Sequence, residues 1–522
     1  MSKNLSEVRR TNDGDERQSS ENDFEESTMT THTEEMDHPP TDLTTAAAER
    51  TAQAGRTPLV IKLLVAATFV VILNETIMIN AIPRLMVDFH VDARAAQWLS
   101  TVFMLTMAAV IPVTGWFLQR VSTRTAYAVA MTTFSVGTAI AAAAPSFEIL
   151  LAARVVQAGG TAVMMPLLMT TLMTVVPESD RGRVMGQVTL AMSCAPALGP
   201  AVSGIILHLG SWRLIFVFVL PIAVLVGVAG MRQLENVGET ESTPVSWLSV
   251  VLAAGGFGSL VYGLSEIGTG DWTGPVLTVV AGVLLIAAFA AYQVRLQQRE
   301  MPLLDLRALR HRTFAISLVL MTAGFMAFLG SMILLPLYLQ DLRGLSELQT
   351  GLLVMPGGLA MGLLGPQVGK LYDRVGARPL VIPGAVGIVV ALAALSRIGA
   401  TTPYPLIVAI HMALMVSLAA VFTPIFTVGL GDLPEHLYSH GSSLLGTLQQ
   451  VAGAIGTAAL IVVMSNRSAH LAESGASQPE ALVGGLQWAF AAAALMGVVV
   501  VASSLLLPSK ADAAPSSTPA HH

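Results

Sequence analysis

The feature of this sequence that most restricts its fold is a series of long segments without charged residues. Residues 313–340 form one such segment, and residues 398–431 form another. A helix rises about 1.5 Å per residue, so about 20 apolar residues cross a hydrocarbon core of roughly 30 Å. Charged residues make up only 12% of the chain, against about 25% in soluble domains. The sequence therefore predicts an all-α integral membrane protein.

The spacing of the apolar segments predicts about fourteen transmembrane helices joined by short loops. The segments lie at roughly 59–82, 96–118, 125–144, 148–176, 183–207, 212–231, 246–265, 274–293, 314–339, 348–370, 378–396, 404–430, 441–464 and 486–507. An even number of spans places both termini on one side. Arginine and lysine are more frequent in the loops of that side, which predicts that both termini are cytoplasmic.

A ten-residue repeat indicates two related parts of the chain. Residues 115–124 and residues 369–378 share their first glycine, a central Arg-Val pair and a final arginine. We interpret them as matching loops in two homologous halves of six helices with two helices inserted between them. The expected divisions are a disordered acidic cytoplasmic tail (1–57), the first half (58–231), the insertion with its linkers (232–312), the second half (313–507) and a cytoplasmic tail (508–522).

Several motifs together give the chain a resemblance to a known family. Residues 73–83 end the first predicted helix, residues 154–160 carry an arginine in the fourth, and residues 195–204 carry repeated small residues and prolines in the fifth. These motifs resemble the major facilitator superfamily, in particular its fourteen-helix drug:proton antiporters and the lincomycin-resistance-type efflux proteins among them. The resemblance covers nearly all of residues 58–507 and implies the major facilitator fold.

The same motifs predict which residues move or lock the two halves. Proline removes a backbone donor and bends a helix, and small residues let a neighbouring helix approach closely. Ordinary close packing of the fifth helix is the alternative reading, and a purely topological role is the alternative for the loop arginines. The expected gating residues are Gly115, Arg120, Arg124, Pro196, Gly199, Pro200, Gly204, Gly369, Asp373, Arg374 and Arg378. Gln119 departs from the family, which usually carries an aspartate there.

Two ionisable residues, Glu75 and Arg154, lie well inside apolar segments, where such residues are costly and tend to be functional. Burial favours the neutral form of a carboxyl group, so Glu75 is the predicted proton carrier with Arg154 as its charge partner. Two alternatives remain: a static ion pair with Arg154, and direct contact of Glu75 with a cationic substrate. The family more usually carries an aspartate at the position of Asn74.

Polar amides and flexible thioethers inside the apolar helices are the predicted substrate contacts. Amides in such helices seek partners within the bundle, and methionine adapts to varied apolar ligands. Packing against other helices is the alternative for each of them. The expected substrate-binding residues are Asn74, Asn80, Gln157, Met165, Gln449 and Gln450.

The absence of several well-known motifs excludes some classes of function. The sequence has no phosphate-binding Gly-rich loop with Lys-Ser/Thr and no His-Glu-x-x-His metal motif, so we expect no enzyme, no metal and no cofactor. No basic patch predicts nucleic-acid binding. The predicted function is proton-coupled export of lipophilic drugs or antibiotics, with lincosamides as candidate substrates. The predicted exporter is a monomer embedded in the cell membrane. A dedicated exporter of one metabolite or amino acid, and a non-transporting membrane sensor, are the alternatives.

Overall fold

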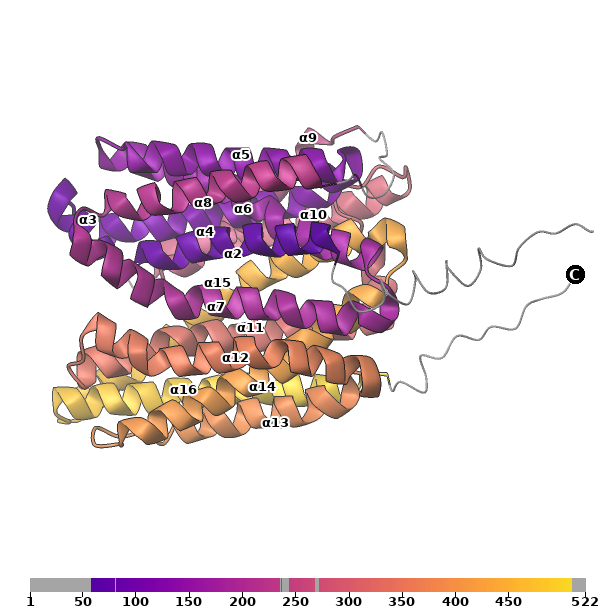
Figure 1. The fold of residues 1–522 in the computed structure, drawn as a ribbon. Helices are drawn as coiled ribbons and strands as arrows, with labels where there is room; N and C mark the ends of the chain where they lie inside the picture. Colours follow the sequence, from indigo (N-terminus) through magenta and orange to yellow (C-terminus); the bar gives the residue numbers. More distant parts are fainter. Residues whose placement is uncertain (1–57, 80, 235, 237–243, 268–271, 509–522) are drawn as a thin grey trace, which may run out of the picture. The chain divides into compact units, whose positions relative to one another are not determined.

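The computed structural model describes residues 58–508, except residues 80, 235, 237–243 and 268–271. The expected tails at 1–57 and 509–522, and Asn80, lie outside the described residues. Within the described part, fourteen helices are long and apolar enough to cross a membrane, as predicted, and the secondary structure is entirely helical. The helices run side by side, and α2 begins at the end of the bundle where α16 finishes (Figure 1). We call this end the terminal end.

The helices before and within the expected insertion follow the apolar segments closely. Their bounds are α2 Leu59–Ile79, α3 Ile82–Phe89, α4 Ala93–Arg120, α5 Thr123–Ala142, α6 Phe147–Val175, α7 Arg181–Leu209, α8 Arg213–Gln233, α9 Trp247–Ser265 and α10 Thr273–Gln297. The short helix α3 was not predicted. A proline lies at its start, and because proline lacks an N–H group, it favours the beginning of a new helix over continuation of α2.

The helices after the expected insertion are longer on average than their apolar segments. Their bounds are α11 Arg312–Leu337, α12 Glu347–Val375, α13 Arg378–Leu395, α14 Tyr404–Gly431, α15 Tyr438–Glu473 and α16 Gln478–Ser504. The extra length lies in polar ends that the apolar segments leave out, namely the last turns of α12 and α15 and the first turns of α16. Ser346 caps α12 and Ser477 caps α16, each in a capping box.

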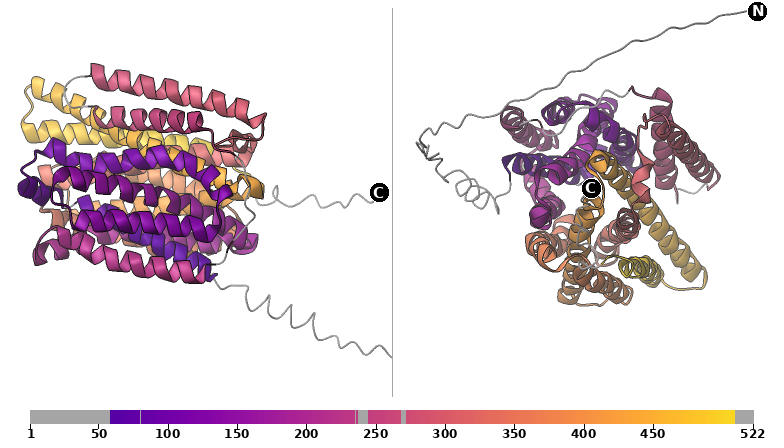
Figure 2. Two further views of the ribbon diagram at one scale, coloured as in Figure 1. Left: turned by 90° about the horizontal axis from the view of Figure 1, so that it is seen from above. Right: turned by 90° about the vertical axis from the view of Figure 1, so that its right-hand side faces the viewer.

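Contacts between helices divide the described chain into groups that pack locally. α5 packs against α6 and α8, α9 packs against α10, and α13 packs against α14 and α16. Two long contacts join earlier helices to later ones: α7 packs along α12, and α15 packs against α4 and α6. Figure 1 shows α7 and α15 in the middle of the bundle, and the right-hand view of Figure 2 looks along the helices from the terminal end. The residue boundaries of two halves and an insertion stay a prediction.

Candidate transport site

Asn74 and Glu75 lie next to each other in the C-terminal half of helix α2. Asn74 is fully buried, and neither its amide nitrogen nor its amide oxygen has a hydrogen-bond partner among the described residues. Glu75 is partly buried, and its carboxylate likewise forms no hydrogen bond or ion pair within the described part of the chain. An unpartnered buried polar group is costly. These two residues therefore bring unsatisfied binding capacity into the bundle.

Helix α2 is held in place by a close contact with α7. The hydroxyl of Thr76 lies 3.0 Å from the carbonyl oxygen of Leu73 in its own helix and 3.4 Å from that of Ala195 on α7. A Cβ atom added at Gly199 would lie 2.8 Å from the Cβ of Thr76. The absence of a side chain at Gly199 thus lets the two helices approach beside Glu75. The gating role expected for Gly199 stays a prediction.

Arg154 on α6 is buried and bound on several sides. Its Nε donates to the carbonyl oxygen of Leu99 (3.2 Å), and one terminal nitrogen donates to Oε1 of Gln157 (3.0 Å). The guanidinium also lies over the ring of Phe103, 4.1 Å from its centre. Gln157 in turn donates to the hydroxyl of Thr138 on α5 (2.9 Å). The side chain of Gln157 is therefore engaged within α5 and α6.

The charges of Glu75 and Arg154 lie close enough to interact, but no nitrogen of Arg154 is within 4.0 Å of an oxygen of Glu75. The two residues come from α2 and α6, which pack against each other. The carboxylate is thus near a positive charge without being bound to it. Such an arrangement leaves the carboxylate available to a proton or another ligand.

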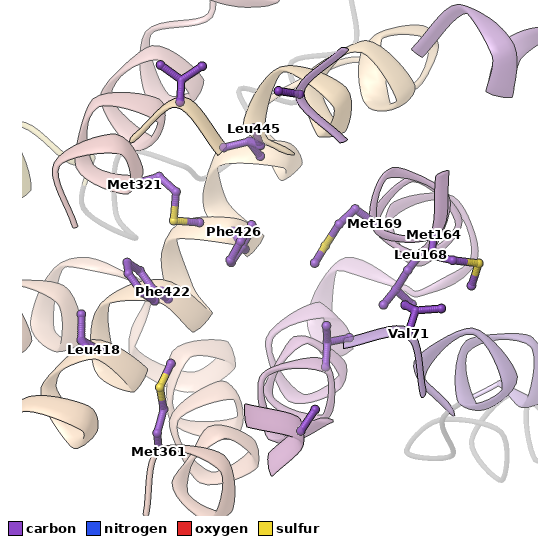
Figure 3. Packing of buried hydrophobic residues seen from close by; sticks show 14 of the residues in the cluster. Val71, Met164, Leu168, Met169, Met321, Met361, Leu418, Phe422, Phe426 and Leu445 are labelled. Carbon is purple, nitrogen blue, oxygen red and sulfur yellow. The ribbon is translucent and has the colours of Figure 1, made fainter. Parts of the chain in front are cut away.

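The predicted amide and thioether contacts lie on α15 and α6. Gln449 and Gln450 are partly buried, and Nε2 of Gln450 lies 3.7 Å from the sulfur of Met107 on α4. Met165 is partly buried, whereas Met164 and Met169 are fully buried in the apolar core. Figure 3 shows Met164, Leu168 and Met169 projecting from α6, with Met321, Met361 and Phe422 on helices of the other part of the bundle.

Helices α7 and α12 meet most closely at the terminal end. Gly182 lies against Gly369, and Gly186 lies against Gly365, so that backbones touch where side chains would clash. Both carboxylate oxygens of Asp373 accept hydrogen bonds from the first turn of α7, one from the N–H of Gly182 and one from the N–H of Arg183, each 2.8 Å long. Free N–H groups at a helix N-terminus favour a carboxylate. Asp373 therefore fastens α12 to α7.

The other expected gating positions on α7 differ in their surroundings. The helix runs without a break through Pro196 and Pro200. A Cβ added at Gly204 would meet only Leu348, at 3.9 Å, which is an ordinary contact. Close approach is thus required at Gly199 and not at Gly204.

The first copy of the repeat lies at a second contact between early and late helices. Gly115 is within α4, and a Cβ there would lie 2.9 Å from Nδ1 of His440 on α15. The hydroxyls of Thr114 and Ser443 are 2.7 Å apart, and Gln119 donates to the carbonyl oxygen of His436 (2.9 Å). Gln119 thus bridges the same two regions without the family's aspartate.

The arginines of the two repeats lie at the terminal end, as expected, in different settings. The guanidinium of Arg120 is 5.5 Å from the centre of the Trp116 ring. The backbone N–H of Arg124, in the first turn of α5, donates to Asn236 (3.4 Å). Arg374 is exposed in the last turn of α12, and Arg378 is the first residue of α13. Their gating role stays a prediction.

Sequence reasoning missed the hydroxyl pairs that join distant helices. Thr170 and Ser442 are 2.9 Å apart, and Thr189 and Thr423 are also 2.9 Å apart. Threonine and serine inside apolar helices usually bond the carbonyl of the preceding turn. A single sequence therefore carries no signal that would pair these residues across the bundle.

Comparisons with known proteins agree with this architecture. Residues 64–457 match the model of the Major Facilitator Superfamily. The MFS-type transporter YcnB of Bacillus subtilis is 37% identical over 442 residues, which cover 84% of this chain and 93% of that protein. The Lincomycin resistance protein LmrB of Listeria monocytogenes is 36% identical over 443 residues, with the same two coverages of 84% and 93%.

Two solved structures share the fold at low sequence identity. The human organic anion transporter MFSD10 has a TM-score of 0.61 at 14% identity and covers 86% of this chain and 100% of its own. The proton:xylose symporter XylE has a TM-score of 0.60 at 15% identity and covers 86% of this chain and 95% of its own. With its fourteen candidate spans and its matched sequence, this chain belongs to the Major Facilitator Superfamily of membrane transporters.

Proposed function

We propose that this protein is a proton-driven antiporter that exports lipophilic compounds, lincosamides among them, across the cytoplasmic membrane of a bacterial cell. The identity of more than a third of the aligned residues with a lincomycin resistance protein supports this substrate class. The excess of arginine and lysine in the loops of the terminal end supports a cytoplasmic position for both termini. The chain acts as a monomer in this proposal.

The observation that carries the proposal is the carboxylate of Glu75. It is an ionisable group inside a transmembrane helix, near the charge of Arg154, with no hydrogen bond or ion pair within the described part of the chain. Arg154 is instead held by Leu99 and Gln157. Glu75 can therefore bind a proton when it faces the outside and release it when it faces the cytoplasm. Each proton moving inward contributes roughly 2.3 kcal/mol per 100 mV.

Substrate contacts in this proposal come from residues that border the same interior. The partly buried Gln449, Gln450 and Met165 offer two amides and a thioether to a lipophilic ligand. Asn74, beside Glu75, adds an amide that has no hydrogen-bond partner among the described residues. Gln157 acts through Arg154, because its own amide already bonds Arg154 and Thr138. A few polar groups in an apolar site suit a broad range of ligands.

Alternating access follows from the two contacts at the terminal end. The α7–α12 contact around Gly182, Gly369 and Asp373 and the α4–α15 contact around Gly115 would close the site toward the cytoplasm. Protonation or substrate binding at Glu75 would release them. The gating residues of the two repeats therefore act at the cytoplasmic end, while Gly199, farther along α7, keeps α2 close to α7.

Accumulation of lincomycin and of an unrelated lipophilic dye in bacterial cells tests the function. Expression of the wild type should lower the accumulation of both compounds, and a protonophore or Glu75→Gln should abolish that effect. Glu473→Gln is the matched control, because Glu473 is exposed near the end of α15. Unchanged accumulation of both compounds on wild-type expression would contradict drug export and favour a dedicated exporter or a sensor.

A further inference from the structure

His440, in the first turn of α15, is a buried titratable residue that the proposed transport cycle does not use. Only 3% of the residue is exposed. Its Nδ1 lies next to the backbone of α4 at Gly115, and this nitrogen has no hydrogen-bond partner among the described residues. We propose that His440 is a second proton-binding site, and that a proton bound there opens the contact between α4 and α15.

A carboxylate lies near His440, but another residue already binds it. Asp305, in the linker before α11, is 2% exposed, and its charge acts on His440. One oxygen of Asp305 accepts from the backbone N–H of Arg307 (2.9 Å) and from its Nε (3.0 Å). The other oxygen lies 2.6 Å from a terminal nitrogen of Arg307. Because Arg307 neutralises this carboxylate, Asp305 attracts an imidazolium ion only weakly.

The inserted helices hold the linker in this position. Oε1 of Gln293 on α10 accepts from the backbone N–H groups of Leu303 (2.8 Å) and Leu304 (3.3 Å). Nε2 of Gln293 donates to the hydroxyl of Ser249 on α9 (2.8 Å), and Gln293 itself is fully buried. The backbone immediately before Asp305 is therefore fixed to the two inserted helices.

The other charged groups around the start of α15 supply no acceptor for Nδ1 within the described part of the chain. The positive charges of Arg307 and of a protonated His436 oppose a charge on His440. The remaining charged residues bind other groups or are exposed: Arg120 lies over Trp116, Arg181 donates to the hydroxyl of Tyr438, Asp432 accepts from the N–H of Phe314, and Arg312 and Glu435 are exposed.

Protonation changes what Nδ1 requires. A neutral imidazole keeps one nitrogen as an acceptor, whereas both nitrogens of an imidazolium donate. In the closed contact the charged ring would be buried with an unsatisfied N–H group, which is costly. Separation of α4 from α15 would give Nδ1 access to water, because His436, four residues earlier, is already exposed. Protons therefore favour the conformer in which this contact is open.

This inference rests on the proposed role of the α4–α15 contact in closing the site toward the cytoplasm. It adds a function for a proton other than the one carried by Glu75. An acidic cytoplasm would protonate His440 and expose the transport site to the cytoplasm more often. The inserted helices take part, because they position the linker that carries Asp305.

Distances between two spin labels at the terminal end test the proposal. The labels are attached to Thr125→Cys on α5 and Glu435→Cys before α15, both exposed positions, in a Cys194→Ser background. The ratio of long to short distances is measured in the purified full-length protein without substrate. An exposed imidazole has a pKa of about 6.5, so proton binding by the open conformer alone should raise this ratio about tenfold between about pH 7.5 and about pH 5.5.

Three variants assign the response to one residue. His440→Gln replaces the imidazole by an amide that does not titrate, so its ratio should not change with pH. His436→Gln is the matched control and should respond like the wild type, because its side chain is exposed and Gln119 binds its backbone carbonyl. Glu75→Gln should also keep the response. His440→Asn serves as a second neutral variant if the elution volume of His440→Gln on size exclusion shows misfolding.

A ratio that does not change with pH in the wild type would overturn the proposal, and so would a His440→Gln response equal to that of the wild type. Loss of the response in Glu75→Gln would overturn it in favour of Glu75. The absence of long distances at either pH, with or without lincomycin, would contradict the gate itself as well. Failure of drug export with an intact pH response would contradict only the proposed function.

Discussion

Asp373 near the end of α12 accepts a 2.8 Å hydrogen bond from the backbone N–H of Gly182 in the first turn of α7. Its other oxygen is bound in the same way by the N–H of Arg183. Hydrogen bonds to a charged group contribute about 1.5–3 kcal/mol each when buried, and less here because the site is partly exposed. These bonds join residues that are 191 and 190 positions apart in the sequence.

Asp373→Ala should favour the conformer that is open at the terminal end. Loss of two hydrogen bonds should raise the rate at which N-ethylmaleimide labels the single cysteine, Cys194, by about tenfold, since 1.4 kcal/mol corresponds to a factor of ten. Cys194 reports on this contact because its sulfur would lie 3.0 Å from a Cβ at Gly362 of α12. Asp432→Ala, on a different helix end, is the control. An unchanged labelling rate in Asp373→Ala would refute the fastening role.

Gly199→Ala should destabilise the protein and Gly204→Ala should not, although both positions lie on α7. The new methyl group at position 199 would clash with Thr76, and overpacking costs about 1–3 kcal/mol. The methyl group at position 204 meets only an ordinary contact with Leu348. Thermal unfolding in detergent should show a lower midpoint for Gly199→Ala only. Equal midpoints for the two variants would contradict the close approach of α2 and α7.

Gln157→Ala should impair transport through Arg154 and not through loss of a substrate contact. The substitution leaves a terminal nitrogen of Arg154 and the hydroxyl of Thr138 without their partner. We expect destabilisation by about 1–3 kcal/mol and a loss of transport of every substrate alike. Gln449→Ala is the comparison, and it should change the relative transport of different substrates with little effect on stability. A change in substrate preference caused by Gln157→Ala would argue for direct contact.

The linker before α11 should respond to acid. Burial of the Asp305 carboxyl favours its neutral form, but hydrogen bonds from Arg307 outweigh burial and lower its pKa. The ionised pair therefore stabilises the fold above the pKa of an unfolded aspartate, about 3.9, and this contribution is lost as the pH falls through the lower folded value. In Arg307→Gln the ion pair and the guanidinium hydrogen bonds are lost while the backbone N–H bond stays, so burial is opposed less and thermal stability should begin to fall at a higher pH.

The control for this prediction is Arg310→Gln, because Arg310 is exposed on the same linker and has no ion pair among the described residues. Its unfolding midpoint should follow the wild type between pH 3 and 7. An Arg307→Gln profile that coincides with the wild type would show that the pair does not set the pKa of Asp305.

The number and position of the spans could be predicted because an uncharged segment of sufficient length has few alternatives to a membrane helix. Even there, α3 was missed, because Arg84 and Asp88 interrupt its apolar residues and it therefore does not stand out as an uncharged segment. Long-range pairs such as Thr189 with Thr423 leave no trace in the periodicity of a single sequence.

The candidate site was predictable only in part. Glu75 and Arg154 stood out because a charge inside an apolar helix is rare. Whether the two residues would form a bound pair depends on the angle of α2 against α6, which local sequence does not specify. The same holds for Gln157, whose partner Thr138 lies on another helix.

Proton release on substrate binding tests the central claim most directly. Purified wild-type protein in weakly buffered detergent solution should release protons when lincomycin is added, because the proton on Glu75 leaves as the substrate binds. Glu75→Gln should bind lincomycin without releasing protons, and Glu473→Gln should release as many as the wild type. Equal proton release from Glu75→Gln and the wild type would contradict the assignment of Glu75 as the coupling group.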